Sequence, residues 1–155
     1  MKIDLYEKAY LAVSGVLLVL CLAALLYAVT VRGIHLPTQV AEVDPHRLAQ
    51  TPPFDRPGVR QTGPNQYEAV IIGRAWVFDP AVIEVPAGAE VTFTATSADV
   101  IHGLNIATTR VNMMLIPGQV TRMVYRFRSP GEYLLICHEF CGIGHHTMAG
   151  KVVVR

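Results

Sequence analysis

Twelve consecutive residues near the C-terminus, CHEFCGIGHHTM (137–148), combine two cysteines, three histidines, a glutamate and a methionine. The residues with sulfur or imidazole donors at regular spacing, four, four and three positions apart, are Cys137, Cys141, His145 and Met148. This spacing fits one face of a helix, but Gly142 and Gly144 would each cost about 1 kcal/mol in a helix interior. The stretch also lies between two strand-like segments, so we predict a loop.

Three kinds of chemistry use donors of this type. A Cys137–Cys141 disulfide is reasonable outside the cytosol, but it leaves His145 and Met148 without a role. Structural zinc takes cysteine, histidine or carboxylate ligands, and methionine is not among its usual ligands. Thiolate, imidazole and thioether together favour copper, because soft sulfur suits Cu(I) and imidazole binds both oxidation states. The loop therefore predicts a copper site.

One more ligand is expected from outside the loop. His102, in SADVIHG, directly follows the alternating segment 90–97, and we expect it to reach the same end of the fold. The second cysteine, Cys141, is the informative residue, since one cysteine would suffice for a mononuclear centre. Two thiolates held four residues apart on a loop can both bridge a pair of copper ions.

The elements that must position these residues have the pattern of short β strands. Residues 90–97 (EVTFTATS) alternate apolar and threonine side chains with a period of two. Further strands are predicted within 68–78, 81–85, 121–128, 132–137 and 151–155. Many short strands separated by proline and glycine turns predict a sandwich or barrel of about 90 residues.

The N-terminal region contains 23 residues without a charge, from Ala9 to Val31, bounded by Lys8 and Arg32. A helix of this length spans about 34 Å, enough to cross a hydrocarbon core of about 30 Å. The run exceeds the apolar part of a signal peptide, usually about 7–15 residues, and no clear A-x-A site follows it. We predict one retained membrane anchor.

Residues 34–63 hold five of the ten prolines and predict a semi-extended connector. The expected organisation is an N-terminal segment with the anchor helix (1–33), the connector (34–63) and the copper domain (64–155). The chain carries 13 basic and 12 acidic residues, so its net charge is too small to favour binding to nucleic acid. No nucleic-acid partner is expected.

The copper loop, preceded by DVIHG and IPGQ, resembles subunit II of haem–copper cytochrome c oxidases, which carries the binuclear Cu(A) centre. The resemblance covers residues 67–155 and, more loosely, the anchor, whose single helix is similar to that of the B-family oxidases. It implies an all-β cupredoxin-like Greek-key sandwich or barrel with one N-terminal transmembrane helix. It also implies that cytochrome c reduces the copper pair, which passes electrons to haem in subunit I. Oxygen reduction coupled to proton pumping would then occur in that other subunit.

The resemblance assigns metal ligands to six residues: His102, Cys137, Glu139, Cys141, His145 and Met148. The two cysteines would bridge two copper ions. His102 and Met148 would complete one ion, and His145 with the backbone carbonyl of Glu139 would complete the other. The motif spacing selects His145 rather than His146, and it gives His138 no ligand role.

Further expectations concern the residues around these ligands. In many relatives the glutamate at this position also binds a magnesium ion shared with subunit I, which makes Glu139 a candidate for that role. Asp99 is expected either to accept a hydrogen bond near His102 or to be a plain turn residue. Trp76, the only tryptophan, with Phe78 nearby, is a candidate for the point where cytochrome c delivers its electron; the alternative is a core aromatic.

The number of basic residues on each side of the predicted helix does not determine the orientation of the anchor, because Lys2 and Lys8 precede it and Arg32 and Arg47 follow it. Because the resemblance implies an extracytoplasmic cytochrome donor, we expect a cytoplasmic N-terminus and a copper domain on the periplasmic side of a bacterial or archaeal cell membrane. Residues 60–155 hold eight basic and seven acidic side chains, so the contact with the donor is expected to be apolar.

Three alternatives stay open. The same motif would serve in a Cu(A)-containing nitric oxide reductase, which the identity of the catalytic subunit would distinguish. A membrane-anchored copper carrier predicts labile Cu(I) without a mixed-valence spectrum, and the second bridging cysteine argues against it. A structural domain with a Cys137–Cys141 disulfide predicts that chelators leave the domain unchanged.

Overall fold

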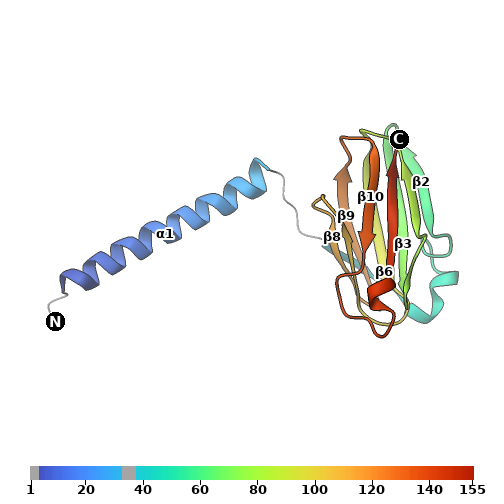
Figure 1. The fold of residues 1–155 in the computed structure, drawn as a ribbon, viewed down its shortest axis with the longest axis horizontal. Coiled ribbons are helices and arrows are strands. Elements are labelled where there is room, and N and C mark those ends of the chain that lie inside the picture. Colours follow the sequence, from blue (N-terminus) through green and yellow to red (C-terminus); the bar gives the residue numbers. More distant parts are fainter. Residues whose placement is uncertain (1–3, 33–37) are drawn as a thin grey trace. The chain divides into compact units, whose positions relative to one another are not determined.

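The computed structural model describes residues 4–32 and 38–155, which belong to two separate compact units. The first contains helix α1 (Leu5–Thr30), a continuous run of 26 residues without a buried side chain (Figure 1). The helix begins earlier than its apolar run because a capping box closes its first turn. Asp4 accepts a hydrogen bond from the Tyr6 N–H, and Glu7 accepts one from the Asp4 N–H. Within the described residues, α1 is long and apolar enough to cross a membrane.

The second unit is a sandwich of two β sheets (Figure 1). The first sheet has the order β1-β9-β6-β3-β2, with β4 paired to β3: β1 (Thr38–Glu42), β9 (Gln119–Arg126), β6 (Glu90–Ser97), β3 (Gln66–Arg74), β2 (Gly58–Gly63) and β4 (Val77–Asp79). The second sheet has the order β5-β11-β10-β7-β8: β5 (Val82–Val85), β11 (Ala149–Val154), β10 (Gly131–Ile136), β7 (His102–Ile106) and β8 (Asn112–Leu115). The pairs β3–β6 and β5–β11 are parallel, and the other pairs are antiparallel.

The main core contains apolar side chains from both sheets. Strand β6 has the predicted bounds 90–97, and its alternation places Val91, Phe93 and Ala95 in this core. Phe127 lies beyond the end of β9, where its ring packs edge-on against that of Phe93 with centroids 6.3 Å apart. Period-two patterning therefore predicted this part of the sandwich correctly.

Residues 38–63 of the predicted connector contain three ordered elements. Strand β1 pairs with β9, and β2 pairs with β3. Between them lies the 3-10 helix η1 (Pro45–Gln50), followed by a turn that contains Phe54. Leu48 and Phe54, each 2% exposed, form a second small core with residues of the first sheet that include Val70 and Ile72. The proline-rich segment thus covers part of a sheet face, while the boundaries of the three predicted parts stay predictions.

The predicted strand 68–78 is divided into two antiparallel strands. Strand β3 ends at Arg74 and pairs there with Val77 of β4, so Ala75 and Trp76 form the reversal. The Ala75 N–H donates to Asp99 Oδ2 at 2.7 Å, and Trp76 Nε1–H donates to the Cys141 carbonyl at 2.9 Å. Both partners are distant in sequence, so the residues of the strand alone could not predict this turn.

Candidate metal centre

The predicted loop 137–148 connects β10 to β11 and folds back on itself at one end of the sandwich. Its two ends are joined by a hydrogen bond from the Cys137 N–H to the Met148 carbonyl, 3.2 Å long. The 3-10 helix η2 (His145–Thr147) forms the last turn, and the Thr147 side chain donates to the Gly144 carbonyl at 2.8 Å. The loop is therefore fixed by its own backbone, as expected for residues that must hold a metal in a defined geometry.

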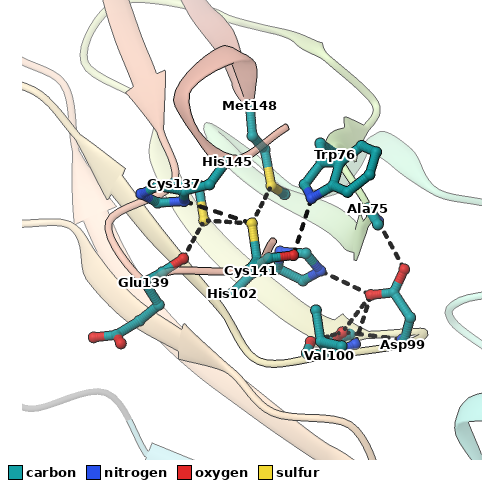
Figure 2. A network of polar contacts seen from close by, with 11 residues as sticks. Ala75, Trp76, Asp99, Val100, His102, Cys137, Glu139, Cys141, His145 and Met148 are labelled. Carbon is teal, nitrogen blue, oxygen red and sulfur yellow. Dashed lines mark hydrogen bonds and ion pairs between the residues drawn. The ribbon is translucent and has the colours of Figure 1, made fainter. Parts of the chain in front are cut away.

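Cys141 lies at the centre of the donor atoms (Figure 2). Its Sγ is 3.8 Å from Cys137 Sγ, 3.5 Å from His145 Nδ1 and 3.8 Å from Met148 Sδ. Both cysteines are free and buried. Cys137 Sγ is also 3.3 Å from the Glu139 carbonyl oxygen, so that carbonyl points into the same cluster. Four side chains and one carbonyl expected as ligands from this loop therefore converge.

His102, at the start of β7, completes the cluster from the other side. One of its ring nitrogens and the two cysteine Sγ atoms all lie within 4.8 Å of one another. The ring is fully buried, and a Cβ on Gly73 of β3 would lie 2.9 Å from His102 Cδ2. The glycine therefore leaves the space that the imidazole fills. The structure brings His102 to the loop as the sequence predicted.

The two nitrogens of His102 have different surroundings. Nε2 lies 2.8 Å from Asp99 Oδ1, whereas Nδ1 is buried without a hydrogen-bond partner among the described residues. A buried polar atom left without a partner costs about 1–3 kcal/mol. A metal ion bound to Nδ1 would remove that cost, since a ligating histidine usually holds its other nitrogen by a hydrogen bond to a carboxylate or carbonyl. The arrangement therefore fits a metal-binding histidine.

Asp99 is held by several donors at once. It accepts hydrogen bonds from the N–H groups of Ala75 and Val100 as well as facing His102. Burial raises the pKa of the Asp99 carboxyl, but the hydrogen bonds from His102 and the backbone outweigh burial and hold this pKa below its usual value. Asp99 is thus a charged acceptor that fixes the orientation of the His102 ring.

The electrostatics of the thiols also fit a metal site. Burial, with the neighbouring Cys137 thiol, raises the pKa of Cys141 to about 11. Cys141 is therefore protonated in the metal-free protein, and a bound metal must displace that proton to obtain a thiolate ligand. Two thiols, imidazole nitrogens, a thioether and a carbonyl form a donor set that suits copper better than zinc.

The other predicted residues lie around this cluster. Trp76 is 37% exposed beside the loop, whereas Phe78 is 2% exposed and belongs to the main core, so only Trp76 of the two presents a surface to solvent.

The two histidines of the loop that were not expected as ligands lie outside the cluster of donor atoms. His146 is exposed on η2. His138 packs against Gly103, where a Cβ would come within 2.6 Å of its ring, and its Nδ1 lies 3.7 Å from Glu139 Oε1.

Sequence reasoning missed three positions that shape the site. Gly142 and Gly144 were considered only as residues that oppose a helix, yet both contact the Trp76 ring. Ala75 was placed within a strand, although its N–H bonds Asp99. The sequence contains only a weak indication of the Trp76 contact: two glycines two residues apart, and a single tryptophan more than sixty positions earlier.

Fold and donor set together define a cupredoxin-like β sandwich with a copper-type site. Among solved structures, the periplasmic domain of subunit II of cytochrome oxidase from Bradyrhizobium japonicum has the same fold, with a TM-score of 0.52, 19% identity, and coverage of 57% of this chain and 83% of that chain. Residues 69–155 match the family model described as cytochrome C oxidase subunit II, periplasmic domain.

Other relatives have a higher sequence identity to this chain and cover more of its length. A cytochrome c oxidase subunit 2 of Thermus thermophilus is 40% identical over 97% of this chain and 92% of its own length. A second Thermus thermophilus sequence of that name is 44% identical over 76% of this chain and 88% of its own. A chain of a heme–copper terminal oxidase dimer solved by cryo-EM is 37% identical, with a TM-score of 0.83 over 97% of this chain and 99% of that chain.

The chain belongs to the cytochrome c oxidase subunit II family. It is the subunit of a haem–copper oxidase through which electrons enter the complex, and it combines one candidate membrane-spanning helix with a periplasmic-type domain.

Proposed function

We propose that the converging donors hold two copper ions as a binuclear Cu(A) centre. Cys137 and Cys141 would be the ligands shared by the two ions, His102 and Met148 would help to hold one ion, and His145 with the Glu139 carbonyl would help to hold the other. The observation that supports this most is the buried Nδ1 of His102, which has no hydrogen-bond partner among the residues that the structure describes. Its ring lies beside two free sulfur atoms 3.8 Å apart. A single-cysteine site would leave the second buried thiol without a role.

The residues of the chain determine how such a centre works. When bound, the copper pair supplies a one-electron redox site whose charge is shared by two ions. Asp99 holds the His102 ring through Nε2, and the backbone contact between Cys137 and Met148 fixes the loop. Cys137, Cys141 and Met148 are at most 8% exposed, so water is largely excluded from the sulfur ligands. A rigid, dry site changes little between oxidation states, which favours fast electron transfer.

The electron donor is cytochrome c, and it docks on apolar side chains around the ligands. Val100 and Ile101 precede His102 and are each 45% exposed, while Phe140 and Ile143 flank Cys141 and are 83% and 87% exposed. Exposed apolar side chains next to metal ligands favour a partner with an apolar surface. Trp76 lies beside Cys141 and accepts the electron from the donor, whereas Phe78 belongs to the buried core.

Electrons then pass from the copper pair to haem in subunit I, where oxygen is reduced with proton pumping. The anchor helix places the N-terminus in the cytoplasm and the copper domain on the periplasmic side of a bacterial or archaeal membrane. The magnesium role for Glu139 receives no support from the described residues, in which its side chain is about half exposed and its carboxylate lies 3.7 Å from His138 Nδ1.

Electron paramagnetic resonance of the copper-loaded full chain tests the proposal. One electron shared by two equivalent copper nuclei gives a seven-line hyperfine pattern, and we expect this pattern. His146→Ala provides the control, since His146 is exposed next to His145 and should leave the spectrum unchanged. A four-line pattern from a single copper ion would contradict the binuclear centre.

A further inference from the structure

Trp76 joins the β3–β4 reversal to the copper loop by a hydrogen bond and by packing (Figure 2). Its Nε1–H donates to the Cys141 carbonyl at 2.9 Å, although the two residues are 65 positions apart. Its exposed fraction of 37% means that most of the indole is covered. Contact with a donor protein requires an exposed edge, but it does not require this hydrogen bond to the loop.

The loop leaves space for the indole at two glycines. Gly142 has a φ of +115°, which itself favours glycine, and a Cβ there would lie 3.2 Å from Trp76 Nε1. Gly144 has φ −89° and ψ 9°, a conformation open to other residues, so its backbone does not require glycine. A Cβ on Gly144 would nevertheless come within 2.6 Å of Trp76 Cε3. The Trp76 ring is therefore the reason why position 144 lacks a side chain.

The same reversal is tied to His102. The Ala75 N–H donates to Asp99 Oδ2 at 2.7 Å, and Asp99 Oδ1 lies 2.8 Å from His102 Nε2. A continuous series of contacts thus leads from His102 through Asp99 and the reversal to the carbonyl of Cys141. His102 begins β7, whereas Cys141 lies on the β10–β11 loop, so no short stretch of chain fixes one against the other.

We propose that the Ala75–Trp76 reversal positions Cys141 relative to His102, with Trp76 packed on Gly142 and Gly144 as the positioning residue. This inference rests on the proposed function, in which both residues are copper ligands. The indole holds the loop backbone from outside, and the Asp99 contacts hold the reversal against His102. Trp76 therefore keeps the copper ligands in place, in addition to its proposed role in accepting electrons.

A double-mutant cycle on the full chain within its oxidase complex tests this role. The measured quantities are the rate of copper loss to a Cu(I) chelator under reducing conditions and the electron paramagnetic resonance spectrum of the oxidised centre. Gly144→Ala should push the indole off the loop and speed copper loss about 10-fold, as is typical when a residue that supports metal ligands is disturbed. In a Trp76→Ala background the same change should add less than about 2-fold, because the ring that it displaces is gone.

Two further variants separate packing from hydrogen bonding. Trp76→Phe keeps a ring over the glycines but lacks the N–H, so copper loss should rise about 5-fold, the equivalent of one hydrogen bond, with altered hyperfine splitting. This variant also keeps the test available if Trp76→Ala fails to assemble. His146→Ala lies two residues after Gly144 on the same loop but is exposed, and its rate of copper loss should match that of the unmutated protein.

Equal effects of Gly144→Ala in both backgrounds, or a Trp76→Phe protein with unchanged copper loss and spectrum, would overturn the positioning role. So would a His146→Ala protein that loses copper as fast as Gly144→Ala. The failure of the proposed function is distinguishable, because the unmutated chain would then lack the seven-line spectrum. A normal spectrum combined with an additive cycle would reject only the role of Trp76.

Discussion

Two partly buried carboxylates of the sandwich, Asp99 and Glu68, have similar electrostatics but different partners. Burial raises the pKa of each, and hydrogen bonds outweigh burial and lower it. Glu68 accepts hydrogen bonds from Thr94 Oγ1 at 2.6 Å and from Arg60 Nε and Nη2 at 3.0 and 2.6 Å. Asp99 instead faces His102, whose other nitrogen has no partner among the described residues.

The difference separates a structural network from a binding site. The charge on Glu68 is balanced by Arg60, and the group is complete without any ligand. The Asp99–His102 pair ends at a buried nitrogen without a partner in the described part of the chain, and the His102 ring lies beside two free thiols. A lowered carboxyl pKa therefore does not identify a functional site by itself; the unsatisfied atom at the end of the network does.

Removal of the central thiol should have the largest effect. Cys141→Ser should abolish the seven-line spectrum because one bridging ligand is lost, even if some copper still binds. The free energy of unfolding of the copper-free chain should change by no more than about 1 kcal/mol, since the hydroxyl is close in size to the thiol. The spectrum and denaturant unfolding measure the two quantities, and a persistent seven-line pattern would remove Cys141 from the bridge.

Glu68→Ala should lower the stability of the fold without affecting the copper site. Loss of this carboxylate leaves Thr94 and Arg60 without their partner and should lower the free energy of unfolding by about 2 kcal/mol, a value reduced for the partial exposure of Arg60. The copper spectrum should stay unchanged. Glu90→Ala serves as a matched control, because its exposed pair with Arg126 is worth about 0.5 kcal/mol or less. A changed copper spectrum in Glu68→Ala would break the distinction between the two networks.

Asp99→Asn should weaken copper binding about 10-fold with little effect on folding, because the neutral amide holds the His102 ring less firmly. Competition with a chelator measures the affinity, and denaturant unfolding of the copper-free chain measures stability. Asp55→Asn, on an exposed turn, is the control. An Asp99→Asn protein with normal affinity but a large loss of stability would place Asp99 in the same class as Glu68.

The smallest expected effect is the pH dependence due to Glu68. Its pKa in the folded chain lies below the ordinary value of 4.5, so its contribution is fully present above that value and is lost as the pH falls through the lower folded pKa. Glu68→Gln should therefore be less stable than the unmutated chain at neutral pH, and the difference should shrink at acidic pH. Unfolding measured from neutral to acidic pH checks this, and a constant difference would contradict the assignment.

The β3–β4 reversal shows where sequence reasoning failed. The segment 68–78 is rich in apolar and β-branched residues and has no glycine at the turn, so local propensity favours one continuous strand. The reversal at Ala75 and Trp76 is instead held by Asp99 and by the Cys141 carbonyl. The connector is a similar case, because Leu48 and Phe54 acquire a role only when the face of β3 lies beneath them.

Local chemistry and periodicity were enough to predict the copper loop, His102, the apolar helix and the β sandwich. Donor types and their spacing are properties of a short stretch of chain, and a period of two or a long uncharged run is visible without a fold. The tertiary structure alone decided that Asp99 holds His102 and leaves the other ring nitrogen without a partner in the part of the chain that is described. It also decided that Trp76 packs on Gly142 and Gly144, because such contacts join segments that are distant in sequence and arise only when the two sheets pack together.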